Sequence, residues 1–211
     1  MMIREILPCR NSKQRSRVCL EDGSGFILYN KEIYRYELAE GKELGEDVYE
    51  RILKEAMIPR ARKRAMHLLE EQDRTRSELF DRLKTAGYLP EAIEDALSYV
   101  ESFHYIDDER YARNYIRYHQ DSKSRRRLSQ DLKKKGLSDD LIRQAMEEEN
   151  QTDPREQIRN LLSKKHFDLS SPDDQTRRKE EARACRFLAS RGFEMSDIID
   201  QVRDFSEHNL N

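Results

Sequence analysis

The chain has 211 residues, and its 36% hydrophobic and 39% charged residues suit several thin cores rather than one thick core. Its 40 Lys and Arg residues nearly balance its 42 Asp and Glu residues, so the formal net charge of −2 excludes a uniformly basic or acidic surface. No apolar run approaches the roughly 18 residues that span a membrane, and three cysteines without a CxxC pair or signal segment argue against a disulfide framework, so we expect a cytoplasmic protein.

The first 30 residues contain short apolar or alternating runs, which are typical of β-strands. Two of these runs flank Glu21–Gly25, a segment whose glycines suit a tight turn. We therefore predict a small antiparallel hairpin or three-stranded unit. Residues 11–17 are predicted to form a basic loop between strands.

Two helical segments are predicted between this unit and residue 58. Asn30 is expected to cap a short helix that ends at Leu38. Gly41 and Gly45 mark turns, and a second helix is expected from about Asp47 to Met57.

The helical period dominates from Pro59 onward, where a proline suits the first turn of a helix. Thr75 and Glu78 have the spacing of a capping box, which predicts the start of the next helix. Gly87 is expected to end that helix in a left-handed conformation, and Pro90 to begin a third helix. These residues predict a three-helix repeat.

The same pattern recurs twice, at offsets of 49 and 56 residues from Gly87 to Gly136 and from Gly136 to Gly192. In each copy a leucine precedes the glycine by four residues and an isoleucine follows it by six. We predict a mainly α fold, an elongated tandem array of three three-helix repeats after a small N-terminal β-hairpin and helix extension. The expected boundaries are 1–58 for the extension and 59–106, 107–151 and 152–211 for the repeats.

Catalytic signatures are missing from the sequence. It has no glycine-rich phosphate loop, HExxH, GxSxG or paired CxxC, and its five histidines lack metal-ligand spacing. Asp107 and Asp108 are the one suggestive carboxylate pair, but acids at a helix start also cap free amides. We expect no enzyme activity, metal, cofactor or small-molecule substrate, and we expect a monomer.

Basic residues make the stronger case for a binding surface. Between Lys123 and Lys135 there are seven basic residues and one acid, and three of the basic residues open a helix, where the helix dipole disfavours them. An ordinary solvated face is the alternative to a stripe that contacts phosphate or acidic protein. The candidate contact residues are Arg74, Arg76, Arg125, Arg126, Arg127, Lys133, Lys134, Lys135, Arg177, Arg178 and Lys179; the last three are expected to precede the middle helix of the third repeat.

Tyrosines gather around the end of the first repeat and the start of the second. Tyr111, Tyr115 and Tyr118 follow a three-to-four spacing on one predicted helix, which favours packing in a core or between repeats. Stacking on nucleic-acid bases is the alternative.

Arg76–Leu79, Gly87–Tyr88 and the run Tyr105–Ala112 resemble the signature of RecX-type regulators of the RecA recombinase. Leu132–Leu137 and Leu188–Phe193 are similar to the family's second and third repeats, so that the resemblance covers roughly residues 60–205. The motif positions that carry it are Gly87, Tyr105, Ile106, Asp107, Asp108, Tyr111, Ala112, Gly136 and Gly192.

The resemblance implies a non-enzymatic modulator that lies in the groove of the RecA filament on single-stranded DNA. Such a protein would lower ATP hydrolysis, strand exchange and repressor co-cleavage, in DNA repair, recombination and the SOS response. The basic residues would then meet acidic filament surface or DNA phosphate. A direct DNA-binding protein built from helix-turn-helix-like units is the rival interpretation, with single- or double-stranded DNA as its partner, and a passive scaffold is the third.

Overall fold

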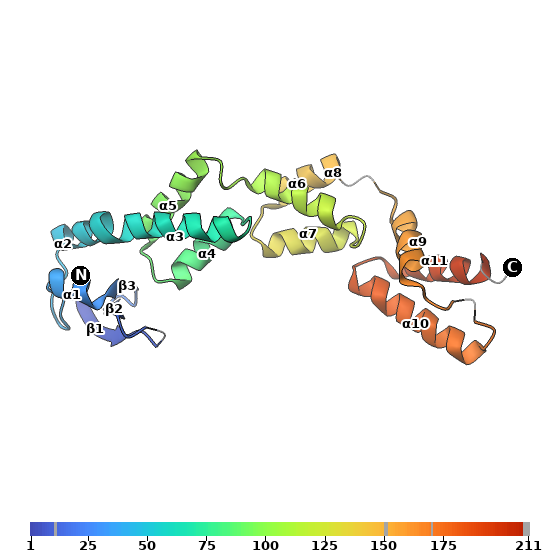
Figure 1. Ribbon diagram of the computed structural model, residues 1–211, viewed down its shortest axis with the longest axis horizontal. Helices are drawn as coiled ribbons and strands as arrows, with labels where there is room; N and C mark the ends of the chain where they lie inside the picture. Colours follow the sequence, from blue (N-terminus) through green and yellow to red (C-terminus); the bar gives the residue numbers. More distant parts are fainter. Residues whose placement is uncertain (11, 150–151, 170, 209–211) are drawn as a thin grey trace. The chain divides into compact units, whose positions relative to one another are not determined.

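A computed structural model describes residues 1–10, 12–149, 152–169 and 171–208. The chain divides into two compact units, Met1–Asp107 (unit 1) and Asp108–Asn211 (unit 2). Helices dominate both units, and the described strands lie in unit 1 (Figure 1). The predicted mainly α fold class with N-terminal strands is confirmed.

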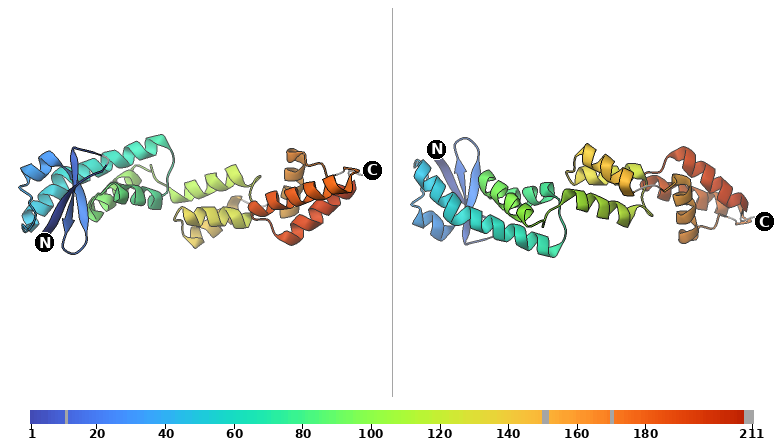
Figure 2. Two further views of the ribbon diagram at one scale, coloured as in Figure 1. Left: turned by 90° about the horizontal axis from the view of Figure 1, so that it is seen from below. Right: turned by 90° about the horizontal axis from the view of Figure 1, so that it is seen from above.

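The N-terminal sheet has three antiparallel strands in the order β1 (Ile3–Pro8), β2 (Arg15–Leu20) and β3 (Gly25–Tyr29). The two further views show these strands crossing beside the helical part of unit 1 (Figure 2). Arg15 and Arg17 lie in β2, so the prediction that a basic loop extends through residue 17 is wrong. Their strand pairs with both neighbours, because Arg17 faces Leu7 on one side and Ile27 on the other.

Helix α1 (Asn30–Arg35) is shorter than predicted and is capped differently. Tyr29 holds the N-cap position, and the Asn30 side chain instead accepts a bond from the Ser16 hydroxyl (2.8 Å) and donates to the Lys13 carbonyl (3.1 Å). The helix stops before Leu38 because Glu37 adopts a φ of 53°, which an α-helix cannot continue.

The second predicted helix is part of a longer one. Helix α2 (Glu46–Arg51) continues through a π-helical segment, η1 (Ile52–Met57), into α3 (Ile58–Glu71). The expected break before Pro59 is therefore wrong. Proline lacks an N–H and disturbs the ordinary helical ladder, and the widened π turn lies directly before it.

The first repeat consists of α3, α4 (Arg76–Thr85) and α5 (Pro90–Ser102). The predicted capping box is confirmed, since the Thr75 hydroxyl accepts from the Glu78 amide and the Glu78 carboxylate accepts from the Thr75 amide. Gly87 has a φ of 82°, which confirms the left-handed end of α4.

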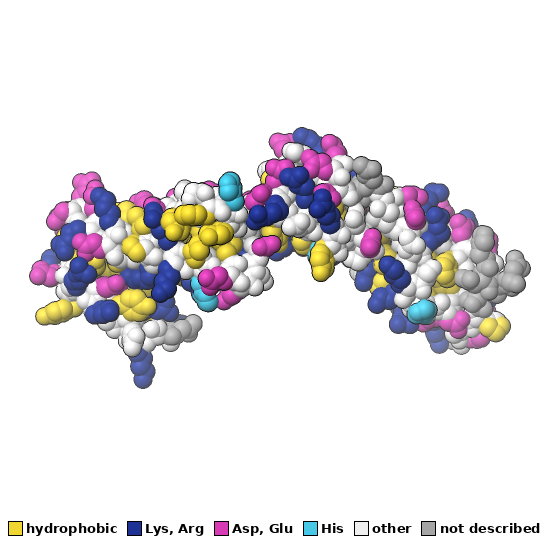
Figure 3. Space-filling view, turned by 45° about the horizontal axis from the view of Figure 1, so that its top comes forward, with side chains coloured by type: hydrophobic (Ala, Val, Ile, Leu, Met, Phe, Trp, Pro, Cys, Tyr) yellow, Lys and Arg dark blue, Asp and Glu magenta, His cyan; other side chains and the backbone are white. Residues whose placement is uncertain are grey.

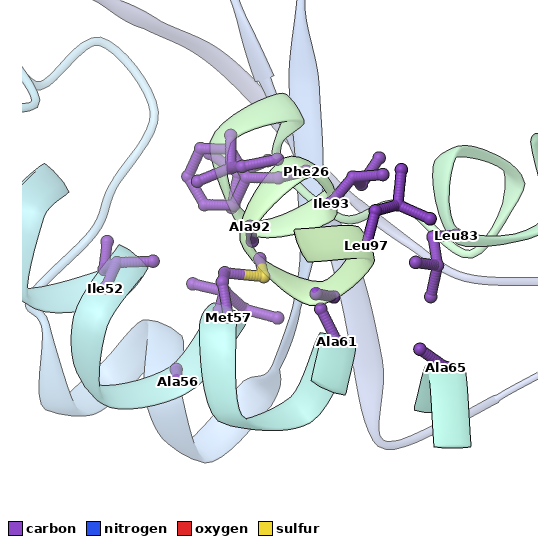
Figure 4. Packing of buried hydrophobic residues seen from close by; sticks show 14 of the residues in the cluster. Phe26, Ile52, Ala56, Met57, Ala61, Ala65, Leu83, Ala92, Ile93 and Leu97 are labelled. Atoms are coloured by element: carbon purple, nitrogen blue, oxygen red, sulfur yellow. The ribbon is translucent and has the colours of Figure 1, made fainter. Parts of the chain in front are cut away.

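One apolar core joins this repeat to the sheet. Phe26 from β3, Met57 from η1 and Leu97 from α5 are fully buried and point toward one another (Figure 4). The Ile27 amide also donates to the Gly87 carbonyl (2.9 Å), which attaches β3 to the glycine turn. The sheet is therefore an integral part of unit 1.

The second repeat comprises α6 (Asp108–His119), α7 (Arg125–Lys134) and α8 (Asp139–Glu149). Leucines of α7 pack in a separate core against α6 and α8. Gly136 has a φ of 79°, as predicted for the end of α7. The buried residues of this core are Ala112, Ile116, Leu128, Leu132, Leu137, Ile142, Ala145 and Met146.

The third repeat comprises α9 (Pro154–Lys165), α10 (Asp174–Ser190) and α11 (Met195–His208) around a third core. Asp153 caps α9, with its carboxylate accepting from the Arg155 amide. Asp173 caps α10, and Ser170 lies outside the described residues.

The second and third repeats are joined at the glycine turn of the third. The Ser124 amide donates to the Arg191 carbonyl (3.0 Å), and the Gln157 side chain donates to the Gln120 carbonyl (3.0 Å). A Cβ on Gly192 would lie 2.7 Å from the Ser124 Oγ, so the turn approaches the start of α7 closely. This contact places residues of both repeats around the first turn of α7.

Candidate functional site

The predicted cations of α7 face solvent because the apolar residues on the opposite face of the helix are buried in the core. Leu128 and Leu132 have no exposed surface, and the Ser124 hydroxyl caps the helix by accepting from the Arg127 amide (3.2 Å). Arg125, Arg126, Lys133 and Lys134 are exposed at the two ends of the helix. Four of the six predicted cations are thus exposed on the surface of the second repeat.

The cations of α7 differ in their ion partners. Arg126 lies 3.2 Å from Glu194 and Lys133 lies 2.6 Å from Asp139, and all four side chains are more than half exposed. Such exposed pairs contribute little to stability and exchange readily for another anion. Arg125 and Lys134 have no ion partner within the part of the chain that the structure describes. These four cations are therefore available to a negatively charged partner.

The remaining two predicted cations of α7 are engaged within their repeat. Arg127 is half-buried, and its Nε lies 3.3 Å from the Asp131 carboxylate one turn later. The ammonium of Lys135, at the C-cap position, lies 5.7 Å from the centre of the Tyr111 ring. A cation–π contact of this kind limits the movement of the Lys135 side chain.

A hollow of about 220 Å³ lies at the first turn of α7 and is lined by Ser122, Lys123, Arg127, Ser190 and Arg191. Lys123 donates to Asp131 (2.8 Å) and to the Tyr115 hydroxyl (2.9 Å), so one carboxylate serves two of the three cations.

The third cation, Arg191, has its guanidinium 3.6 Å from the centre of the Phe187 ring. Its buried Nε has no hydrogen-bond partner among the described residues, and burial lowers the pKa of this guanidinium. A cation that burial disfavours, and that pairs with no carboxylate of the described residues, suits an approaching anionic group.

The first repeat does not display its two predicted cations in the same way. Arg74 is only 7% exposed, and its Nε donates to the Leu68 carbonyl (3.1 Å), so the prediction that it belongs to a partner-binding surface is wrong. Arg76 is paired with Glu94 (2.6 Å) and Glu101 (2.8 Å). These side chains bind the start of α4 to α3 and α5.

The third repeat carries its predicted cations inside a helix. Arg177, Arg178 and Lys179 lie within α10, so the expectation that they precede the middle helix is wrong, because Asp173 caps that helix earlier. Arg177 and Arg178 both pair with Asp174, whereas Lys179 is exposed with no ion partner among the residues described.

One relation among the repeats was not predicted from the sequence. A basic residue precedes each turn glycine by thirteen positions: Arg74, Lys123 and Lys179. Arg74 and Lys123 both bind acceptors inside their own repeats. The spacing is visible in the sequence and identifies this position as structural in two repeats.

The residues of the predicted signature around Asp107 mainly support the fold. Ile106 and Ala112 are buried, and Asp108 with Glu109 places acids in the first turn of α6, where the helix dipole favours them. Tyr111 and Tyr115 are half-buried with stacked rings 6.3 Å apart, whereas Tyr118 is 89% exposed, so the expected packing of Tyr118 is wrong. Tyr105 is 47% exposed and stacks on Phe103.

Mixed charge characterises the surface in view. Basic and acidic side chains are intermingled over both units (Figure 3). Within the described ranges, no three His, Cys, Asp or Glu side chains are grouped so as to hold a metal ion. None of the described helices combines the length and apolar character that crossing a bilayer requires.

Comparisons with known proteins match all three repeats. The family models of the first, second and third three-helix domains of RecX match residues 61–99, 107–146 and 152–200. The regulatory protein RecX of Vibrio campbellii is 35% identical over 64% of this chain and 84% of its own length. The chain belongs to the RecX family. It is also 25% identical to the regulatory protein RecX of Clostridium acetobutylicum over 95% of this chain and 94% of that one.

Solved RecX structures share the fold. A crystal structure of regulatory protein RecX is 25% identical, covers 96% of this chain and 98% of its own, and has a TM-score of 0.56. RecX from Lactobacillus salivarius, at 22% identity and a TM-score of 0.54, covers 70% of this chain and 95% of its own. The membership confirms the sequence resemblance and identifies the three-helix repeats as the family's domains.

Proposed function

We propose that this chain is a non-enzymatic regulator that binds the RecA filament on single-stranded DNA and inhibits its ATPase, strand-exchange and co-protease activities. Its relatives are named regulatory proteins, which supports a regulatory rather than a catalytic role. The proposal places the protein in the cytoplasm as a monomer that needs no cofactor.

We choose α7 as the contact surface because its cations are exposed. Arg125 and Lys134 lie at opposite ends of a helix anchored by two buried leucines, and neither is neutralised by a carboxylate of the described chain. A partner with acidic side chains or phosphates gains attraction there without first breaking an internal pair. The nearby exposed pairs of Arg126 and Lys133 add cations that a filament surface can recruit.

Several modest contacts are enough for a filament ligand. Because successive protomers repeat the same surface, contacts made by separate repeats reinforce one another through effective concentration. The charges differ among the repeats, so we assign most of the affinity to α7 and the smaller part to Lys179 in the third repeat.

The test is inhibition of the RecA ATPase on single-stranded DNA by the full chain and by an Arg125→Glu/Lys134→Glu variant. We expect inhibition by the wild type and a loss of potency of about tenfold or more in the variant, since each reversed contact is worth on the order of 1 kcal/mol. An Arg186→Glu/Lys164→Glu variant is the matched control, because it reverses two exposed cations of the third repeat that lack ion partners among the described residues.

Three outcomes would contradict parts of this proposal. If the wild type does not inhibit, the regulator function is wrong. If the α7 variant inhibits as well as the wild type, the contact surface is wrong. If inhibition follows naked-DNA affinity and disappears steeply with salt, direct DNA binding accounts for it instead.

A further inference from the structure

Unit 1 contains a second basic surface that none of the predicted contact residues belongs to. A hollow of about 560 Å³ lies between the sheet and α3, and its lining includes Arg15, Arg60, Lys63, Arg64 and His67. We call it the sheet groove. No carboxylate of the described residues lines it, although acids outnumber basic residues in the chain as a whole. This separation of charge sets the groove apart from the mixed surface around it.

The positions of these side chains follow from helix geometry. Arg60, Lys63, Arg64 and His67 have the spacing i, i+3, i+4 and i+7, which places them along one face of α3. The buried stripe of the same helix, Ala61, Ala65 and Leu68, packs into the core and fixes the direction of the basic face. Arg15 reaches the same hollow from β2.

The cations of the groove differ in whether they have an ion partner among the described residues. Arg60 pairs with Glu32 (2.7 Å), and its guanidinium lies 4.9 Å from the centre of the Tyr29 ring, so it is fixed in place. Arg15, Lys63 and Arg64 have no ion partner in the described segments. His67 lies 3.6 Å from both Glu70 and Glu71, and neither glutamate lines the hollow.

Tyr88 lines the same hollow as these cations. Its hydroxyl donates to the Arg60 carbonyl (3.4 Å). Burial raises the pKa of this phenol, while the charges of Arg60, Arg64 and Arg15 act in the opposite direction. Like charges gathered around one half-buried group repel one another unless an anion lies among them.

The basic lining continues beyond the first hollow. A neighbouring hollow of about 380 Å³ shares Arg15, Ile27 and Ala86 and adds Arg10 and Arg17. A third hollow of about 510 Å³ shares Arg64 and Ala86 and adds Arg82, but Glu78 and Asp81 also line it. The cations of the first two hollows, which no described carboxylate lines, suit a polyanion better than a single phosphate.

We propose that the sheet groove binds the phosphate backbone of a nucleic-acid strand, with Arg15, Lys63 and Arg64 as the main phosphate contacts. Guanidinium and ammonium groups supply the hydrogen bonds and charge that phosphates require, and they carry no base specificity. This site goes beyond the proposed RecA regulation because it lies in unit 1, uses no residue of α7, and acts on nucleic acid without RecA.

The test is fluorescence anisotropy of a labelled oligothymidine of about 20 nucleotides, long enough to follow an extended groove. The full chain is compared with a Lys63→Glu/Arg64→Glu variant at several salt concentrations. We expect at least a tenfold loss of affinity in the variant. The dependence of log affinity on log salt should weaken by about 1.4, because each single-strand phosphate contact contributes about 0.7. Both side chains are exposed, so circular dichroism should show an unchanged fold.

Two controls distinguish this groove from other basic surfaces. The Arg186→Glu/Lys164→Glu variant makes the same change in net charge elsewhere and should bind like the wild type. The Arg125→Glu/Lys134→Glu variant should lose less affinity for the oligonucleotide than the Lys63→Glu/Arg64→Glu variant, although it loses more of the inhibition of RecA. A duplex of the same length shows whether a paired strand also enters the groove.

Three results would overturn the proposal. One is equal affinity and equal salt dependence of the wild type and the Lys63→Glu/Arg64→Glu variant. Another is an equal loss in the Arg186→Glu/Lys164→Glu control, which would mean that net charge alone governs binding. The third is complete displacement of the oligonucleotide by inorganic phosphate at low millimolar concentration, which would make the groove a site for a single phosphate.

Discussion

The first and second repeats share one helical plan but use their basic residues in opposite ways. In the first repeat, Arg74 binds a backbone carbonyl in the interior and Arg76 binds two glutamates. In the second repeat, α7 leaves Arg125 exposed at the position equivalent to Arg76. The difference teaches that repeated helices keep their burial pattern, while the surface charge of each copy is free to serve the fold or a partner.

The glycine turns add a second contrast between unit 1 and unit 2. A Cβ on Gly87 would lie 2.5 Å from Ile27 of β3, whereas a Cβ on Gly192 would lie 2.7 Å from Ser124 and 2.9 Å from Arg127 at the start of α7. The same local turn thus packs on a sheet in one unit and on a neighbouring repeat in the other. In both turns glycine is required for two reasons: its φ is positive, and a neighbouring side chain occupies the space that a Cβ would need.

Replacing either glycine with alanine should cause the largest loss of stability. We expect Gly87→Ala and Gly192→Ala to lower the free energy of unfolding by about 2–4 kcal/mol, from a positive φ combined with overpacking. Gly23→Ala is the control, because Gly23 has a φ of 85° but nothing within 4 Å of its Cβ position, and should cost only about 1 kcal/mol. Urea unfolding measures all three, and equal losses would show that packing around the turns is unimportant.

The buried Arg74 tests the contrast between the repeats directly. Arg74→Ala should destabilise unit 1 by about 2–3 kcal/mol, because it leaves the Leu68 carbonyl without its donor and removes a buried side chain. Arg125→Ala, the exposed counterpart in α7, should stay within about 0.5 kcal/mol of the wild type. Hydrogen exchange of peptides from α3 and α7 reports each repeat separately. A larger loss of protection in α7 would reverse the assignment of structural and displayed cations.

Local signals in the sequence predicted much of the fold. The Thr75–Glu78 capping box and the turn glycines were predicted correctly, because caps and left-handed turns depend on a few neighbouring residues. The π-helical passage before Pro59 was missed. Its continuity depends on packing of Ile52 and Met57 in the core of unit 1, which a proline signal cannot reveal.

The candidate surfaces were harder to predict than the helices. The cations of α7 could be recognised because they are adjacent in the sequence. The ion pair between Arg126 and Glu194 could not be predicted, because Glu194 belongs to another repeat. The sheet groove combines Arg15 on β2 with Lys63 and Arg64 on α3. The helical spacing of Lys63 and Arg64 is visible in the sequence, whereas Arg15 was predicted to lie in a loop. Only tertiary packing brings the strand and the helix together.

The smallest expected effect concerns Asp131, which pairs with two cations at the start of α7. Asp131 is 12% exposed and accepts from Lys123 (2.8 Å) and Tyr115 (3.2 Å). Burial acts to raise the pKa of this carboxyl, but the hydrogen bond and charge of Lys123 outweigh it and hold the pKa below its ordinary value. The carboxylate therefore stabilises the folded state above the unfolded-state pKa, and this contribution is lost as pH falls through the folded-state pKa.

We expect Asp131→Asn to lower the free energy of unfolding by about 1 kcal/mol near neutral pH, because the amide cannot balance the charges of Lys123 and Arg127. The deficit should shrink as the pH falls below the ordinary aspartate pKa of about 4 and through the lower folded-state pKa, because the wild-type carboxylate is then protonated as well. Urea unfolding across this range measures it. Asp121→Asn is the matched control, an exposed acid with no ion partner in the described chain, and should show no such pH dependence. A deficit that stays constant with pH would mean that Asp131 acts by shape rather than charge, leaving the cations at the start of α7 without an internal counter-ion of consequence.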